Sequence, residues 1–216
     1  MKRKKASEYY CLGIESTADD FSVGISTFEG EILANIISAY VPEEGGIHPR
    51  EAARHHAEAA SKVLEEVFTK SGIRPQDLSV IAFSQGPGLG PCLRTGATVA
   101  RALVSHLKVP LVGVNHCIAH IEIGKLKTGA KDPITLYVSG GNTIVAAFDS
   151  GRYRVLAKHW TLPLETVWTF LQEKQGYTKR KVCHSELLLK NLPLKGRNSF
   201  LCHTQLKAWT HPSADY

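Results

Sequence analysis

The first two-thirds of this chain follow an orderly pattern of apolar and polar positions. Three short segments, separated by brief polar turns, predict strands at 9–15, 21–27 and 32–40. A helix is predicted next, because Pro49 suits a first helical turn and Gly72 suits the residue after a last turn. The apolar face expected on this helix consists of Ala53, Ala57, Ala60, Leu64, Val67 and Phe68.

Beyond Gly72 the pattern alternates between strands and helices. The order of elements predicts an α/β fold in which a mixed sheet is flanked by helices. The expected elements are a strand at 80–84, a glycine- and proline-rich loop at 86–91, a helix at 98–107, a strand at 111–115, a helix that carries two histidines, and a hairpin of 135–139 with 143–148. The loop is either a surface that a ligand approaches or a tight connection between strand and helix.

The orderly pattern stops near residue 156. All three tryptophans come after that residue, whereas only two of the eighteen glycines do. We therefore predict a basic disordered leader at 1–7, an ordered region at 8–156 and a poorly folded tail at 157–216. The basic residues behind the net charge of +6 gather in the leader and the tail, so the ordered region shows no electrostatic footprint for nucleic acid.

Several classes of protein are disfavoured by composition. No apolar run is long enough for a transmembrane helix, and no apolar segment follows the basic start as a secretory signal would require. The five cysteines include no Cys-x-x-Cys pair, which is typical of a reducing compartment. The sequence therefore predicts a cytoplasmic protein with no membrane contact.

The most informative residues are His116 and His120. At helical spacing their Cβ atoms lie roughly 5–6 Å apart on one face, so the two imidazoles can share a metal ion. The alternative is a structural or surface pair. Cys117 occupies the position where a zincin carries its glutamate base, which disfavours a metallopeptidase. His48, His55 and His56 lack the spacing of a shared site and are interpreted as residues of a polar face.

Two turns are candidates for phosphate binding. Tyr137 leads into Ser-Gly-Gly, where unhindered amides can approach a phosphate and the phenolate can serve as a hard ligand for iron. The alternative is a half-buried strand tyrosine. The turn at 13–20 offers the hydroxyls of Ser16 and Thr17, and its alternative is an ordinary polar hairpin turn.

Five stretches in order resemble the universal tRNA threonylcarbamoyladenosine synthase family, most closely its archaeal form, the catalytic subunit of the KEOPS complex. These stretches are Gly13–Ala18, Gly45–Ala53, Gly86–Arg94, Asn115–His120 and Tyr137–Thr143. The resemblance covers about residues 9–156. It implies the actin-like ATPase fold of two lobes, of which this chain holds the first.

The resemblance also implies an activity. Members of this family are acyltransferases that move a threonylcarbamoyl group from threonylcarbamoyl-AMP to the N6 amine of the adenosine next to the anticodon in tRNA. Their partners are KEOPS subunits, including a small kinase-like protein, and adenylate or ATP is the type of ligand bound. No residue of this chain is identified as a general base.

The family's site residues can be carried over where the motifs match. The metal ligands are then His116, His120 and Tyr137, together with an aspartate of the second lobe that this chain lacks. The metal is most often Fe²⁺, with Zn²⁺ or Mg²⁺ left open. The substrate phosphate contacts fall on Tyr137, Val138, Ser139, Gly140 and Gly141.

The end of the chain departs from the family. Plausible codons for residues 157–166, read two bases later, give the wording that the family has there, so we hypothesise that residues from about 157 onward are a frameshifted reading. Sequencing the encoding DNA tests this, because an intact downstream frame must then encode the second lobe. The chain is accordingly expected to be weakly active or inactive. The alternative is a non-catalytic lobe that binds nucleotide, metal or KEOPS-type partners.

Overall fold

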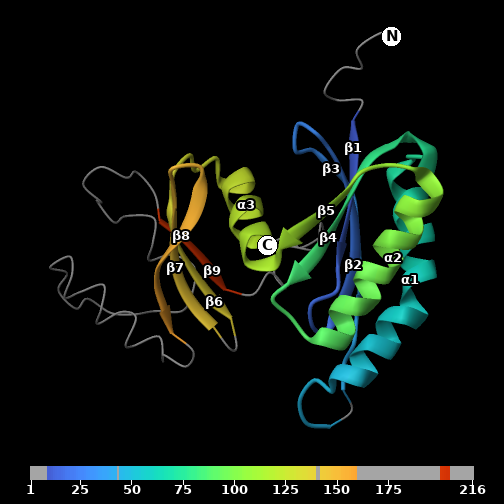
Figure 1. The fold of residues 1–216 in the computed structure, drawn as a ribbon, viewed down its shortest axis with the longest axis horizontal. Helices are drawn as coiled ribbons and strands as arrows, with labels where there is room; N and C mark the ends of the chain where they lie inside the picture. Colours follow the sequence, from blue (N-terminus) through green and yellow to red (C-terminus); the bar gives the residue numbers. More distant parts are fainter. Residues whose placement is uncertain (1–8, 43, 140–141, 160–199, 205–216) are drawn as a thin grey trace, which may run out of the picture. The chain divides into compact units, whose positions relative to one another are not determined.

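A computed structural model describes residues 9–42, 44–139, 142–159 and 200–204. The chain falls into two compact units, Met1–His116 and Cys117–Tyr216, and each has a sheet of its own (Figure 1). The predicted leader lies outside the described residues, as does most of the predicted tail. The boundary expected near residue 156 stays a prediction.

The first unit is a five-stranded mixed sheet with helices, as the sequence predicted. The strand order is β3-β2-β1-β4-β5, in which β1, β4 and β5 run parallel while β2 runs antiparallel to both of its neighbours. The elements are β1 (Tyr10–Glu15), β2 (Asp20–Thr27), β3 (Ile32–Ala39), α1 (Pro49–Ser71), the short 3-10 helix η2 (Pro75–Asp77), β4 (Leu78–Gly86), α2 (Gly90–Leu107) and β5 (Leu111–Asn115).

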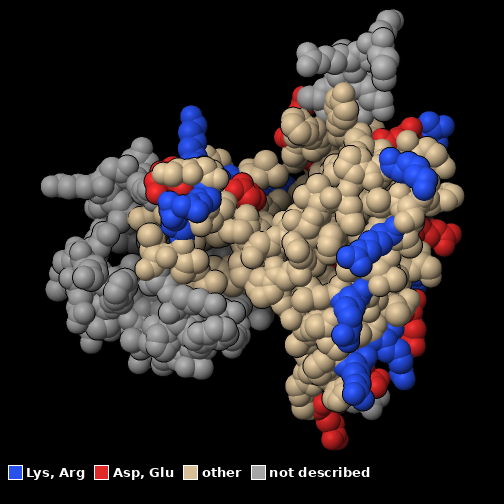
Figure 2. Space-filling model, viewed as in Figure 1, with Lys and Arg blue, Asp and Glu red and all other residues tan. Residues whose placement is uncertain are grey.

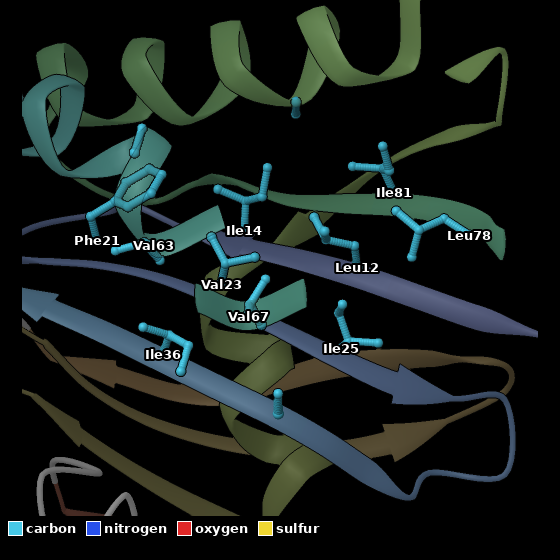
Figure 3. Packing of buried hydrophobic residues seen from close by; sticks show 13 residues of the cluster. Leu12, Ile14, Phe21, Val23, Ile25, Ile36, Val63, Val67, Leu78 and Ile81 are labelled. Atoms are coloured by element: carbon cyan, nitrogen blue, oxygen red, sulfur yellow. The ribbon is translucent and has the colours of Figure 1, made fainter. Parts of the chain in front are cut away.

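The core of this unit lies between the sheet and α1 and α2, which run side by side over one face (Figure 1). Alternate residues of the strands point into this core because side chains in a strand alternate between the two faces of the sheet. Figure 3 shows the strand residues packed against the apolar residues of α1. Its buried residues include Leu12, Ile14, Phe21, Val23, Ile25, Val63, Val67 and Ile81.

The ends of α1 follow the prediction, but α2 begins earlier than expected. Pro49 occupies the first turn of α1, and Gly72 adopts a left-handed conformation at φ 68° while its N–H donates to the carbonyl of Phe68 at 3.0 Å. Helix α2 starts at Gly90 rather than near residue 98, with Pro91 in its first turn. Adjacent glycine and proline residues predict a loop, but proline also suits the first turn of a helix, and here the helix begins at this point.

The buried face of α1 differs from the predicted one because a histidine belongs to it. Buried residues are Ala52, His56, Ala60, Val63 and Val67, whereas Ala57 is exposed. His56 has no exposed surface, and its ring lies 5.6 Å from that of Phe21. The interpretation of His56 as a polar-face residue is therefore wrong, although Ala60 and Val67 of the predicted face are buried as expected.

The stability of the first unit is expected to fall in mild acid because of His56. Burial lowers the pKa of His56, although the nearby charges of Glu15 and Asp19 oppose this. The unfolded chain, in which the pKa is about 6.5, therefore binds the proton more tightly. The contribution of neutral His56 to the unfolding free energy is fully present above about pH 6.5. It falls by about 1.4 kcal/mol per pH unit as the pH drops from about 6.5 toward the pKa of His56 in the folded protein.

Urea unfolding between pH 7 and pH 5 measures this effect. We expect His56→Leu to flatten the pH dependence of the unfolding free energy, because leucine stays neutral in the core. The exposed His48 supplies the control, and His48→Leu should leave the slope as in the parent chain. Equal slopes for the parent and His56→Leu would show that His56 has no part in the acid sensitivity.

Charged side chains of both signs stand on the outer surface of the first unit (Figure 2). On α1, Arg54 lies 3.6 Å from Glu51 and 3.5 Å from Glu58. None of the helices in the described ranges is both long and apolar enough to cross a membrane.

The second unit contains a four-stranded sheet of order β8-β7-β6-β9. Its elements are α3 (His116–Thr128), which begins at the last residue of the first unit, β6 (Ile134–Ser139), β7 (Asn142–Asp149), β8 (Arg152–His159) and β9 (Phe200–Thr204). The predicted histidine-bearing helix and the hairpin are confirmed. Strand β8 runs through residue 156, and β9 pairs in parallel with β6.

Candidate functional site

Three of the sequence motifs meet at one edge of the first sheet. Strands β1, β4 and β5 are parallel and end at Glu15, Gly86 and Asn115, with His116 directly after β5. Ligands of α/β sheets bind beyond the carboxyl ends of such strands. The fold therefore places the turn after β1, the glycine-rich loop and the first histidine where a ligand is expected.

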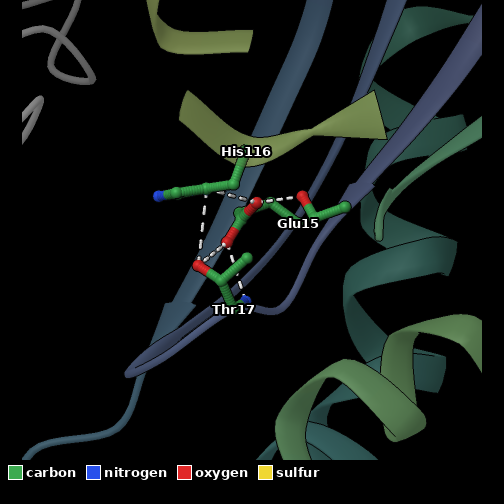
Figure 4. Close-up of polar contacts among 4 residues, drawn as sticks. Glu15, Thr17 and His116 are labelled. Carbon is green, nitrogen blue, oxygen red and sulfur yellow. Dashed lines mark hydrogen bonds and ion pairs between the residues drawn. The ribbon is translucent and has the colours of Figure 1, made fainter. Parts of the chain in front are cut away.

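Glu15 is at the centre of this edge, and sequence reasoning did not single it out. Its Oε1 accepts from the amide of Thr17 at 2.7 Å and from the hydroxyl of the same residue. Its Oε2 accepts from the hydroxyl of Ser84 and lies 3.2 Å from Nδ1 of His116 (Figure 4). The sequence carries no local signal for this contact, because only the order of the strands brings the ends of β1 and β5 to one edge of the sheet.

The contacts keep Glu15 ionised. Burial raises the pKa of this carboxyl group. The hydrogen bond and charge of His116 and the hydroxyls of Ser84 and Thr17 lower the pKa by more than burial raises it, so that it falls to about 2. An ionised carboxylate only accepts hydrogen bonds, so Nδ1 of His116 must carry a proton that it donates to Glu15.

The turn at 13–20 does not offer its hydroxyls to a phosphate. Ser16 is 1% exposed and Thr17 is 4% exposed, and both the amide and the hydroxyl of Thr17 are bonded to Glu15. Of the two alternatives for this turn, the structure favours the polar turn.

The glycine-rich loop packs tightly on that turn. The amide of Leu89 donates to the carbonyl of Thr17 at 2.7 Å. A Cβ at Gly88 would lie 2.6 Å from that carbonyl oxygen, and a Cβ at Gly96 would lie 2.0 Å from Oγ of Ser16. Of the two readings of the loop, a tight connection between strand and helix is the one that the structure supports.

In the second unit, two of the three predicted metal ligands lie together. His120, on α3, has its ring 5.6 Å from the ring of Tyr137, on β6, and Tyr137 is 5% exposed. Val138 and Ser139 complete β6 and pair with Thr143 and Asn142. Gly140 and Gly141, the remaining predicted phosphate contacts, lie outside the described residues.

A polar and aromatic cluster joins α3 to the strands β7 and β8. Nζ of Lys125 donates to Glu122 at 3.1 Å and to the hydroxyl of Tyr153 at 3.0 Å, and that hydroxyl donates to Glu122. The same ammonium lies 5.5 Å from the ring centroids of Phe148 and Tyr153. The cluster fixes the helix that carries His120, and the sequence signalled only its Glu-x-x-Lys pair.

Tyr153→Phe is expected to lower the unfolding free energy by about 1 kcal/mol, because it removes the hydroxyl that joins Glu122 and Lys125. Urea unfolding measures this change, and faster amide hydrogen exchange in α3 should accompany it. Tyr9→Phe, at an exposed position of the first unit, is the control. If both variants behave alike, the cluster does not hold α3.

The predicted metal ligands are two histidines and a tyrosine. Among the described residues, no group of three or more His, Cys, Asp or Glu side chains is placed to hold an ion. The predicted set contains only two residues of these four types, because its third member is a tyrosine. Its donor atoms, imidazole nitrogen and phenolate oxygen, are ones that iron and zinc accept.

The chain matches the family model described as tRNA N6-adenosine threonylcarbamoyltransferase over residues 31–179. The chain belongs to this family. The match extends beyond residue 156, where the tail was predicted to begin. The resemblance inferred from the five sequence stretches is thereby confirmed.

Curated relatives carry this name or that of a bifunctional protein of threonylcarbamoyladenosine biosynthesis. The tRNA N6-adenosine threonylcarbamoyltransferase of Methanopyrus kandleri is 50% identical over 172 residues, which cover 77% of this chain and 50% of that protein. The one from Ignicoccus hospitalis is 56% identical over 146 residues, covering 68% and 44%. A probable bifunctional tRNA threonylcarbamoyladenosine biosynthesis protein of Methanosarcina mazei is 58% identical over 152 residues, covering 69% and 28%.

The chain spans about half the length of the transferase relatives that it matches. Among solved structures, YeaZ from Pseudomonas aeruginosa superposes with a TM-score of 0.50 at 15% identity, covering 70% of this chain and 66% of that one. That likeness concerns the fold alone. It confirms the predicted actin-like ATPase fold, of which this threonylcarbamoyltransferase family member holds a partial first lobe.

Proposed function

We propose that this chain is the metal- and phosphate-binding lobe of an enzyme that transfers the threonylcarbamoyl group of threonylcarbamoyl-AMP to the N6 amine of the adenosine next to the anticodon in tRNA. The observation that carries the proposal is the family match over residues 31–179, with 50–58% identity to curated relatives. Because the chain spans about half the length of those transferases, we expect it to bind ligands but to transfer the group weakly or not at all.

In this proposal His116, His120 and Tyr137 hold one divalent metal ion, most suitably Fe²⁺. The proximity of the rings of His120 and Tyr137 supports this set. When bound, the metal supplies positive charge beside the substrate phosphate as the mixed anhydride breaks.

The other contribution of the chain is to seat the adenylate phosphate. We assign this role to Tyr137, Val138 and Ser139, where β6 ends, and to Gly140 and Gly141, where small residues let a ligand approach the backbone. Fixing the adenylate in one orientation supplies part of the rate enhancement. The reaction would take place in the cytoplasm with tRNA and KEOPS-type subunits, including a small kinase-like protein, as partners.

A transfer assay and a metal-binding assay on the same purified chain test the proposal. The chain is incubated with Co²⁺, threonylcarbamoyl-AMP and tRNA, and the modified nucleoside is measured by mass spectrometry, with the Methanopyrus kandleri relative as positive control. We expect metal binding that His120→Ala removes, together with trace transfer at most. Absence of metal binding would contradict the proposal.

The second candidate is a lobe that binds nucleotide, metal or KEOPS-type partners without turnover. The short coverage of the transferase relatives favours it. Metal binding with no detectable transfer, even when partner subunits are added, is the outcome that selects this candidate.

A further inference from the structure

Glu15, the last residue of β1, has four polar groups around its carboxylate. Thr17 and Ser84 together direct an amide and two hydroxyls at the carboxylate, and His116 adds its ring nitrogen. The side chain is 31% exposed, so these contacts hold an ionised group at a partly open position. Because the amide and hydroxyl of Thr17 and the hydroxyl of Ser84 hold the carboxylate in one orientation, the carboxylate can in turn orient a further group that donates to it.

The fourth group is the imidazole of His116. Its Nδ1 lies 3.2 Å from Oε2 of Glu15 and 3.4 Å from Oγ1 of Thr17. Both atoms can accept a hydrogen bond from an N–H, because the hydroxyl of Thr17 donates its own proton to Glu15. Figure 4 shows the other ring nitrogen turned away from Glu15.

We propose that Glu15 is a positioning residue: by accepting the Nδ1 proton of His116 it fixes the tautomer and the plane of the ring and presents Nε2 as a metal ligand. Histidines that bind metals commonly donate their other N–H to a carboxylate, which also makes the ligating nitrogen more basic. The inference rests on the proposed function, because it needs His116 to bind a metal.

The position of Glu15 suits this role. It ends β1, and His116 begins α3 directly after β5, so two strands of one rigid sheet set the distance between the groups. A negative charge at the start of a helix is also favourable, because the helix dipole is positive there.

The test measures the affinity of the full chain for Co²⁺ by its visible absorption, together with the histidine ring nitrogens by NMR in the metal-free protein. In the parent chain we expect His116 to carry its proton on Nδ1. We expect Glu15→Gln to populate the other tautomer and to weaken Co²⁺ binding by about 10-fold to 100-fold. Glu58→Gln, which removes the same charge from the exposed face of α1, should change neither quantity.

The outcomes separate this inference from the proposed function. If His116→Ala abolishes Co²⁺ binding while Glu15→Gln leaves the tautomer and the affinity unchanged, the inference is overturned and the metal site stands. If His116→Ala does not change Co²⁺ binding, the metal site itself is overturned and the inference falls with it. Should Glu15→Gln fail to fold, Glu15→Asp, which keeps the charge but draws the carboxylate back from His116, must weaken Co²⁺ binding instead.

Discussion

Gly88→Ala is expected to destabilise the first unit by about 3 kcal/mol, the upper part of the range for overpacking. The added Cβ would lie 2.6 Å from the carbonyl oxygen of Thr17 and 2.7 Å from its Cβ. The neighbour cannot swing aside, because the oxygen is backbone and already accepts from the amide of Leu89. The loop must therefore move off the turn that follows Glu15, and urea unfolding measures the cost.

Gly90→Ala is the matched control, two residues further along. A Cβ there meets nothing within 4 Å, and Gly90 is the first residue of α2, where alanine is tolerated. We expect its stability to equal that of the parent or to exceed it by up to about 1 kcal/mol. If the two alanine variants are equally stable, the tight packing of this loop on the turn is refuted.

His120→Ala is expected to weaken Co²⁺ binding by more than the roughly 10-fold to 100-fold that loss of an outer partner of a metal ligand costs. It removes a proposed ligand itself, and the ring of Tyr137 then loses its neighbour on α3. The fold should persist, because His120 is only half-buried and lies outside the hydrophobic core.

The control for this substitution is His55→Ala. His55 is also half-buried on a helix and contacts Ser38 at 3.0 Å, but it belongs to no proposed site. Titration of both variants with Co²⁺ separates loss of a ligand from loss of any histidine. An affinity reduced equally in the two variants would speak against a specific role for His120.

The elements of the fold could be predicted because period and capping residues are local signals. Pro49 and Gly72 mark the ends of α1 in the sequence as they do in the structure. The buried face of α1 could not be predicted in the same way, since His56 is buried by the shape of its surroundings rather than by its own polarity. Residue type alone carries no information on whether the core accommodates a ring at that position.

The candidate site shows the same division between local and distant information. His116 and His120 were found from their spacing on one helix. Glu15 was not, because its partners Ser84 and His116 are 69 and 101 residues away and only the order of strands brings them together. The sequence left two alternatives for the hydroxyl of Thr17 for the same reason, since its contact to Glu15 becomes visible only in three dimensions.

The most direct test of the proposed metal centre is an anomalous-difference map of crystals of the full chain loaded with Co²⁺. We expect one strong peak at about 2.0–2.2 Å from Nε2 of His116, Nε2 of His120 and the phenolate oxygen of Tyr137. A peak elsewhere, or donor atoms of these three side chains more than about 10 Å apart, too far for bonds of that length to one ion, would contradict the proposed centre.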